Sequence, residues 1–316
     1  MTAQQIHSGR ISVKELDAIL GEPFRVLDDG FIRVIDYMGS DHAVVQSARI
    51  SYGQGTKKVR EDRGLIRYLM RHRHTTPFEM CEIKLHVRVP MDCWRQWIRH
   101  RTANVNEYST RYSEAIDSVQ KTSPSEWRCQ VTANRQGSGE LMPSTTGENL
   151  SQREEELQKL SRDVYQERLD SGVAREQARK DLPLSTYTEA YWKIDLHNLL
   201  HFLSLRMDQH AQQEIREYAN VIGYDIVAKW CPIVWEAFLD YRLHASVLSG
   251  VEWNILEAII RGDGQAAVKL AEDNGLVSHG KQGIKKNRER EEFEEKLRRL
   301  GISPPWLPDD TLPDNQ

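Results

Sequence analysis

Hydrophobic and polar residues alternate most regularly over residues 81–90, which read CEIKLHVRVP. Every second residue from Cys81 to Val89 is apolar, and the residues between them are charged or histidine. An alternation with a period of two predicts a strand that packs one face on a core and turns the other toward water or a ligand. Strands are also predicted over 31–38 (FIRVIDYM) and 185–196 (STYTEAYWKIDL).

Helical spacing of apolar residues dominates most of the remaining chain. It predicts helices over 41–50, 57–74, 91–101, 150–171, 197–230 and 232–243, and a helix rich in lysine, arginine and glutamate over about 281–300. Pro90 and Pro232 stand where a proline favours the first turn of a helix. The stretch 113–148 is rich in Gly, Ser, Thr, Pro and Asn and predicts a long loop.

These elements predict three parts. Residues 1–30 form a polar lead with one short helix near VKELDAIL, residues 31–244 form the main domain, and residues 245–316 form a helical, charged extension. A chain of 316 residues is long enough to bury a sizeable core.

Composition narrows the class of protein. A net charge of -4 argues against a general nucleic-acid binder, which usually carries a basic excess. The four cysteines, Cys81, Cys93, Cys129 and Cys231, are scattered without a CxxC pair, so neither a zinc site nor a disulfide framework is predicted. No apolar run is long enough for a membrane span, and the N-terminus lacks an apolar signal core. A soluble protein of the reducing cytoplasm is therefore expected.

Positive charge is concentrated in RQWIRHRTANVNEYSTRY, residues 95–112. In a helix, Arg99, His100 and Arg101 would spread over roughly 200° of the circumference and could not share one solvated face. One arginine there would suit a helix end, where cations complement the dipole. Polar residues follow at Asn106, Glu107, Ser109, Arg111 and Tyr112. Together they favour an anion site, since a guanidinium matches phosphate oxygens.

Arg206 is the second unusual cation. It lies on or beside the apolar stripe of its helix, three and four residues from Leu203 and Phe202. A permanent charge in that register needs a partner. A structural ion pair with Glu214 or Asp208 and a functional role are equally consistent with this feature alone.

Two histidine pairs raise the question of a metal. His197 and His201 share a helix face, and His72 and His74 form an HxH, but neither pair has an evident third ligand. Contact with an aromatic cofactor or helix packing is favoured, and no metal is predicted. The chain has neither a GxGxxG nor a P-loop, and no site typical of a nucleophilic cysteine.

The spacing of Arg99-His100-Arg101 and Ser109 resembles the RHR-x7-S signature of flavin-dependent thymidylate synthases. Further segments resemble the same family in the same order, across roughly residues 30–240. They are SARISYG (47–53), HTTPFE (74–79), RQWIRHR (95–101), NEYSTRY (106–112), WRCQVTANRQGS (127–138), ARKDLP (178–183) and WKIDLHNLLHFLSLRMDQHAQQEIREYA (192–219).

The resemblance implies reductive methylation of dUMP to dTMP. Methylenetetrahydrofolate would supply the carbon, NADPH the reducing equivalents, and FAD would be the cofactor. The implied fold is α/β (α+β), with an antiparallel sheet and long packed helices in a homotetramer whose active sites are shared between subunits. Residues 31–244 would then be the catalytic domain.

The resemblance also assigns site residues. Arg206 would be catalytic, binding the uracil ring and helping to ionise its N3. The positions matching dUMP contacts are Gln96, Arg99, Glu107, Ser109, Thr110, Arg111, Arg179 and Arg206. The positions matching FAD contacts are Ser51, Thr76, Arg99, His100, Arg101, Asn106, Glu107, Asp195, His197 and His201. Some family members have Gly at Thr110, and others have Asn or Arg at Asp195, His197 and His201.

Two other functions fit parts of the sequence. A nucleotide- or RNA-binding module would use the arginines for phosphates and the tryptophans for stacking. A metal-dependent nucleotide phosphohydrolase would use the two histidine pairs. Neither accounts for the ordered set of segments.

Overall fold

The computed structural model describes residues 11–50, 59–131, 137–280 and 283–307. The chain divides into two compact units, Met1–His244 and Ala245–Gln316. Among the described helices, none combines the length and the apolar character that crossing a membrane requires.

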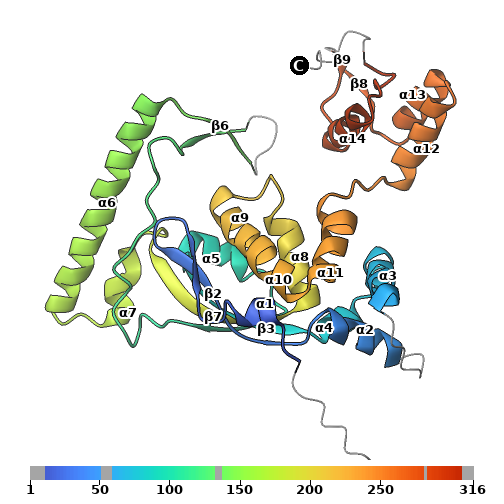
Figure 1. The fold of residues 1–316 in the computed structure, drawn as a ribbon. Coiled ribbons are helices and arrows are strands. Elements are labelled where there is room, and N and C mark those ends of the chain that lie inside the picture. The colour runs from blue at the N-terminus through green and yellow to red at the C-terminus, as the bar shows by residue number, and fades with distance from the viewer. Residues whose placement is uncertain (1–10, 51–58, 132–136, 281–282, 308–316) are drawn as a thin grey trace, which may run out of the picture. The chain divides into compact units, whose positions relative to one another are not determined.

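The first unit is built on a five-stranded sheet with the order β1-β2-β3-β7-β4 (Figure 1). The strands are β1 (Pro23–Val26), β2 (Gly30–Met38), β3 (Glu82–Pro90), β7 (Tyr187–Asp195) and β4 (Asn104–Glu107). All neighbours are antiparallel. The central pair β3 and β7 is in register over its full length, from Glu82 opposite Asp195 to Pro90 opposite Tyr187. The three predicted strands are therefore confirmed.

Aromatic residues join the sheet to the helices that cover it. The covering helices include α5 (Met91–Trp97), α8 (Leu196–Arg206) and α9 (Gln213–Asn220). Trp97 of α5 lies 5.1 Å from Trp192 of β7 and 4.9 Å from Phe202 of α8, between ring centroids. Trp94, Trp97 and Trp192, which we call the tryptophan cluster, are fully buried, so their apolar area stabilises this interface.

The remaining helices and strands complete the first unit. They are α1 (Lys14–Asp17), α2 (Asp41–Ile50), α3 (Val59–Arg71), α4 (Thr76–Glu79), the hairpin β5 (Arg128–Gln130) and β6 (Ser138–Leu141), α6 (Ser144–Asp170), α7 (Arg175–Ala178), a 3-10 turn (Arg179–Asp181), a π-helix (Val221–Val227), α10 (Ala228–Trp230), α11 (Pro232–Phe238) and a second π-helix (Leu239–Leu243). The long α6, green in Figure 1, runs along one side of this unit.

The helix predicted over 91–101 ends earlier, at Trp97. The backbone N–H of His100 donates to the carbonyl of Trp97 at 3.0 Å and closes a turn there. The chain has to reverse at this point, because β4 begins at Asn104, where it pairs with Lys193 of β7. Arg99, His100 and Arg101 therefore lie after the helix, and the expectation that they spread around it is wrong.

Two other predicted segments are divided differently in the structure. The loop predicted over 113–148 contains the hairpin β5–β6 and the first turn of α6. The helix predicted over 197–230 is interrupted by the turn 207–212 and includes the π-helix Val221–Val227. Here the tertiary packing of short elements overrides the local apolar spacing.

Residues 11–30 and the described residues after 244 contain regular structure that packs on hydrophobic cores. Leu16 of α1 and Val26 of β1 are buried in the main core, so no structural boundary follows residue 30. The second unit consists of α12 (Gly250–Ile260), α13 (Gly264–Asp273), β8 (His279–Gly280), β9 (Gly283–Ile284) and α14 (Arg288–Arg299). It has its own core, in which Phe293 and Leu297 of α14 are fully buried. This charged helix therefore buries one face.

Candidate active site

Arg206 ends α8 and directs its guanidinium to the end of α5. Its Nε donates to Nε2 of His100 at 3.2 Å, and its Nη2 donates to the backbone carbonyl of Gln96 at 3.2 Å. The structural ion pairs considered for Arg206 are absent from the described residues. Glu214 instead accepts from Arg128 at 2.5 Å, and Asp208 lies 2.8 Å from the imidazole of His210.

His100 is a neutral acceptor for this arginine. Burial, together with the nearby Arg206 and His201, lowers the pKa of His100 to about 4. Since Nε2 accepts from Arg206, the proton of the neutral ring is assigned to Nδ1. Burial also lowers the pKa of Arg206, but an arginine remains charged at neutral pH. The site therefore holds a cation whose two hydrogen-bond acceptors, His100 and the Gln96 carbonyl, are uncharged.

A chain of amides supports the end of α5 beside Arg206. The side chain of Gln96 donates to the side-chain carbonyl of Gln212, and Gln212 donates to Oδ2 of Asp92 at 3.0 Å. Sequence reasoning identified Gln96 but missed Gln212. The two glutamines are 116 positions apart, and nothing local in the sequence indicates that they meet.

Four predicted substrate residues gather around a cavity of about 610 Å³, which we call the β4-side cavity. They are Glu107, Ser109, Thr110 and Arg179. Arg179 donates to the hydroxyl of Thr110, and Thr188 of β7 donates to Oε1 of Glu107 at 2.9 Å. Arg111 is exposed and pairs with Glu176 at 3.1 Å. This cavity thus presents the half-buried Arg179 and several hydroxyl groups to a ligand.

A second cavity of about 270 Å³ lies against α8, and we call it the α3–α8 cavity. The predicted cofactor residues His197 and His201 line it, together with His74 and Thr75, which precede the predicted Thr76. The ring of His201 is 5.8 Å from that of His100. His100 therefore lies between Arg206 and this cavity. Arg73 and Arg242 also line the cavity, and sequence reasoning missed both.

The remaining predicted residues are not gathered in either cavity. Arg99, Arg101 and Asn106 are exposed, and no ion pair or hydrogen bond joins their side chains to other described residues. Asp195 caps α8, since its carboxylate accepts from the backbone N–H of Asn198 at 2.9 Å. Ser51 lies outside the described residues.

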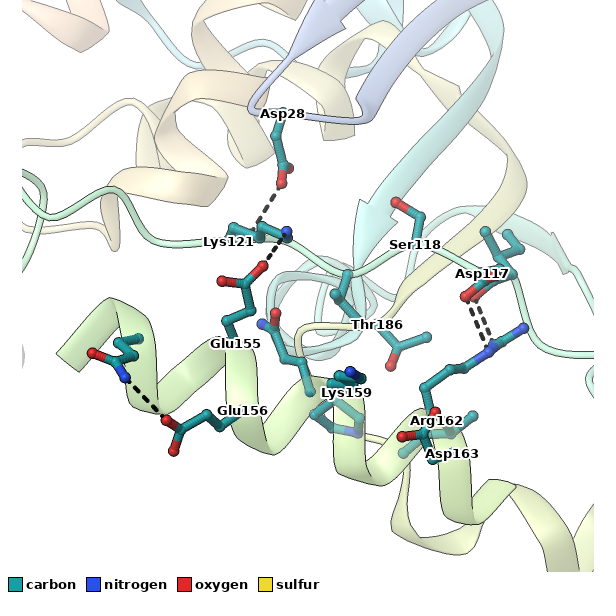
Figure 2. A pocket seen from close by; sticks show the side chains of 16 residues that line it. Asp28, Asp117, Ser118, Lys121, Glu155, Glu156, Lys159, Arg162, Asp163 and Thr186 are labelled. Atoms are coloured by element: carbon teal, nitrogen blue, oxygen red, sulfur yellow. Dashed lines mark hydrogen bonds and ion pairs between the residues drawn. The ribbon is translucent and has the colours of Figure 1, made fainter. Parts of the chain in front are cut away.

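A third cavity, of about 800 Å³, is bordered by α6 and the segment 116–121 (Figure 2). Its cations face acids. Lys121 pairs with Glu155 at 3.1 Å, and Arg162 pairs with Asp117 at 3.0 Å. None of the predicted site residues lines it. Its lining has more carboxylates than cations, so it fits an anionic ligand less well than the α3–α8 cavity, whose lining has no carboxylate.

Comparison with known proteins gives the family. The family model described as thymidylate synthase complementing protein matches residues 33–233. The chain is 52% identical to the flavin-dependent thymidylate synthase of Wolbachia pipientis wMel over 254 residues, covering 80% of this chain and 89% of that protein. It is 48% identical to the enzyme of that name from Rickettsia conorii, covering 80% and 90%. The chain belongs to the flavin-dependent thymidylate synthase family.

A solved structure agrees with this flavin-dependent thymidylate synthase assignment. The UMP/dUMP methylase PolB from Streptomyces cacaoi, bound with 5-Br dUMP, matches with a TM-score of 0.63 and 32% identity, covering 70% of this chain and 99% of that one. The predicted fold of antiparallel sheet and packed helices is thereby confirmed.

Three of the four cysteines are enclosed, and only Cys129 is exposed. Cys81, Cys93 and Cys231 are buried, and burial raises the pKa of Cys93 and of Cys231. A protonated, enclosed thiol is a poor nucleophile. Within the described residues, no group of three His, Cys, Asp or Glu side chains is placed to hold a metal ion.

Proposed function

We propose that this chain methylates dUMP reductively to dTMP, with methylenetetrahydrofolate as the carbon donor, NADPH as the reductant and FAD as the cofactor. Family membership and the UMP/dUMP methylase neighbours support the reaction. The geometric observation that carries the proposal is the Arg206 guanidinium, which donates to two neutral acceptors, His100 Nε2 and the Gln96 carbonyl.

Arg206 is the residue to which we assign the uracil ring. Its contacts with His100 and the Gln96 carbonyl fix the plane of the guanidinium, and none of them neutralises its charge. A preorganised cation in a partly desolvated position stabilises negative charge that develops on a bound ring. Proton loss from N3 of uracil creates such a charge, so Arg206 would favour the ionised ring.

The β4-side cavity is the place to which we assign the sugar and phosphate of dUMP. Arg179 offers a planar pair of N–H donors, and Ser109 and Thr110 offer hydroxyl groups. Arginine and hydroxyl donors are the usual partners of phosphate oxygens. Glu107, which accepts from Thr188, is oriented to accept from a sugar or base donor.

The α3–α8 cavity suits part of an anionic dinucleotide. Its polar lining consists of arginine, histidine, serine and threonine side chains, with no carboxylate among the residues that line it. We assign FAD to this cavity and to the adjoining His100. When bound, FAD supplies the redox chemistry that converts the transferred carbon into a methyl group.

We further propose a homotetramer with active sites shared between subunits. Arg179 and Arg206 belong to separate groups in the chain, the first at the β4-side cavity and the second beside His100. A site assembled from two copies would let both reach one nucleotide. We place the reaction in the cytoplasm, where the chain's free thiols would stay reduced.

The test is anaerobic incubation of the purified, flavin-loaded protein with dUMP, methylenetetrahydrofolate and NADPH, followed by chromatography for dTMP. We expect dTMP to form only when all three are present. Flavin-loaded protein that consumes no dUMP under these conditions would overturn the proposal.

A further inference from the structure

The α3–α8 cavity contains two arginines outside the positions that match dUMP or FAD contacts. Arg73 follows the C-terminal end of α3, and Arg242 belongs to the π-helix after α11. Apolar side chains such as Phe78 and Phe238 form part of the wall, and the arginines and histidines form the rest. Arg73 is exposed and Arg242 is half-buried, so an anion in the cavity could reach both cations.

Arg73 occupies a backbone position that favours glycine. Its φ is +59°, in the left-handed region. The N–H of His74 donates to the carbonyl of Leu69 at 2.9 Å, and the N–H of Arg73 donates to that of Met70 at 3.3 Å. This is the Schellman pattern that ends many helices, with arginine at the position where glycine is usual. A non-glycine residue costs free energy in this conformation, and such costs are concentrated at functional sites.

Arg242 lies close enough to Arg73 for the two charges to interact. Burial, and secondly the charge of Arg73, lowers the pKa of Arg242. One nitrogen of its guanidinium donates to the carbonyl of Met70 at 3.3 Å, at the end of α3. That bond uses one of the five N–H donors of an arginine. Two like charges are thus held together at the edge of one cavity.

Two other arginines of α3 form ion pairs with acids of α11 and the π-helix that follows it. Arg63 of α3 lies 2.5 Å from Glu236 of α11, and Arg67 lies 2.9 Å from the same carboxylate. Arg67 also contacts Asp240. Among the described residues, neither Arg73 nor Arg242 has such an ion pair. The segments supply acids for two arginines and leave the two beside the cavity without one.

We propose that Arg73 and Arg242 bind a phosphate of FAD in the α3–α8 cavity. This rests on the proposed function, because it takes FAD to be the cofactor. A phosphate would offset the repulsion between the two guanidiniums and match their planar donors. The cavity, at about 270 Å³, could hold part of a dinucleotide, and the predicted flavin residues His197 and His201 also line it.

The experiment compares FAD affinity in the full-length protein and three variants. Apoprotein is titrated with FAD, and binding is followed by quenching of flavin fluorescence. Arg73→Gly and Arg242→Gln should each weaken FAD binding roughly 10-fold or more, the usual loss for a charge-assisted hydrogen bond. Arg63→Ala removes a paired arginine from α3, the helix that precedes Arg73, and should change the affinity less than about 2-fold.

Two further readouts separate a phosphate contact from a structural role. The dependence of FAD affinity on salt should become shallower in Arg73→Gly and Arg242→Gln, because each removes a charge from the contact. The Arg73→Gly apoprotein should also melt at a higher temperature than wild type, since glycine relieves the left-handed strain. Weaker binding by a more stable protein cannot come from misfolding.

The outcomes are distinct. Unchanged FAD affinity in both variants, with a wild-type protein that binds FAD, overturns the inference and leaves the proposed function intact. A rise in the KM for NADPH with unchanged FAD affinity also overturns it, because the phosphate would then belong to the reductant. A wild-type protein that binds no FAD at all overturns the proposed function and the inference with it.

Discussion

Arg206 and His100 form a pair in which each side chain sets the state of the other. The cation helps to keep the imidazole neutral, and the imidazole orients the cation without cancelling its charge. Sequence reasoning could identify Arg206, because a permanent charge on an apolar helix is unusual and needs a partner. It could not identify the partner, because His100 is 106 positions away.

Replacing Arg206 should remove activity and leave the fold in place. We expect Arg206→Ala to lower kcat for dTMP formation roughly 10²- to 10³-fold, the usual loss for one preorganised group that stabilises developing charge. Arg206→Lys should be nearly as poor, since a point charge cannot replace a planar fork. Flavin absorbance should be unchanged in both.

Arg216→Ala is the matched control for this pair of variants. Arg216 is on the next helix, and within the described part of the chain its side chain donates only to the carbonyl of Gln209. It should keep near-normal turnover. Near-normal turnover in either Arg206 variant would contradict the role assigned to Arg206.

His100 should make the folded protein sensitive to mild acid. Its pKa in the folded protein is about 4, below the ordinary value of 6.5, so between these pH values the unfolded chain binds a proton that the folded one refuses. Stability is therefore lost as pH falls from 6.5 toward 4. Because the ring is only half-buried, we expect a loss on the order of 1 kcal/mol.

Urea unfolding of wild type and His100→Gln across this pH range measures the effect. Other groups titrate in the same window, so the informative quantity is the difference between the two proteins. The free energy of unfolding should fall more steeply with acid in wild type. Parallel curves would show that His100 titrates alike in both states.

At the scale of elements, the length of a strand decides whether its apolar pattern can be recognised in the sequence. β3 was predictable because nine residues alternate with a period of two. The hairpin β5–β6 was not, because its strands have three and four residues without an apolar alternation. It is tied to α9 by Arg128, which contacts Glu214 from 86 positions away. The early end of α5 has the same kind of cause, since it depends on where β4 joins the sheet.

The helix α8, which carries Arg206, should depend on its N-terminal cap. Asp195 accepts the backbone N–H of Asn198, one of the donors that a helix start leaves free. Asp195→Ala should destabilise the apoprotein by about 1 kcal/mol, whereas Asp195→Asn keeps a capping oxygen and should lose little. Urea unfolding without FAD tests this apart from the predicted cofactor contact. Equal stability of all three proteins would remove the capping role.

At the scale of the whole molecule, the family segments predicted the main fold, and the C-terminal unit shows the limit of composition. Residues 288–299 contain so many charges that their composition does not indicate a buried face. Its buried face needs only Phe293, Leu297 and two buried charged residues that pair with each other, Arg290 and Glu294 at 2.9 Å. So few apolar residues do not stand out in a sequence in which most neighbouring residues are charged. Likewise, a site assembled from several copies cannot be completed from one chain.

Mixed assemblies should reveal whether Arg179 and Arg206 serve one site from different chains. Arg179→Ala and Arg206→Ala should each be inactive alone. When the two are co-expressed with different tags and purified as mixed oligomers, random mixing across a two-chain site leaves about a quarter of sites without either change. Activity should recover to that order relative to wild type. A mixture that stays inactive, with mixed oligomers demonstrated, would mean that both arginines come from one chain.

The tryptophan cluster gives this protein an optical signal of its own. Trp97 packs on Phe202, which in turn lies 4.9 Å from the ring of His100, so the indoles are close to the site assigned to FAD. Indole emission overlaps the light that flavins absorb, and excitation passes efficiently between rings at such short range. Flavin bound beside His100 would therefore dim the intrinsic emission of the protein. Loading and release of the cofactor could then be followed in real time without any label.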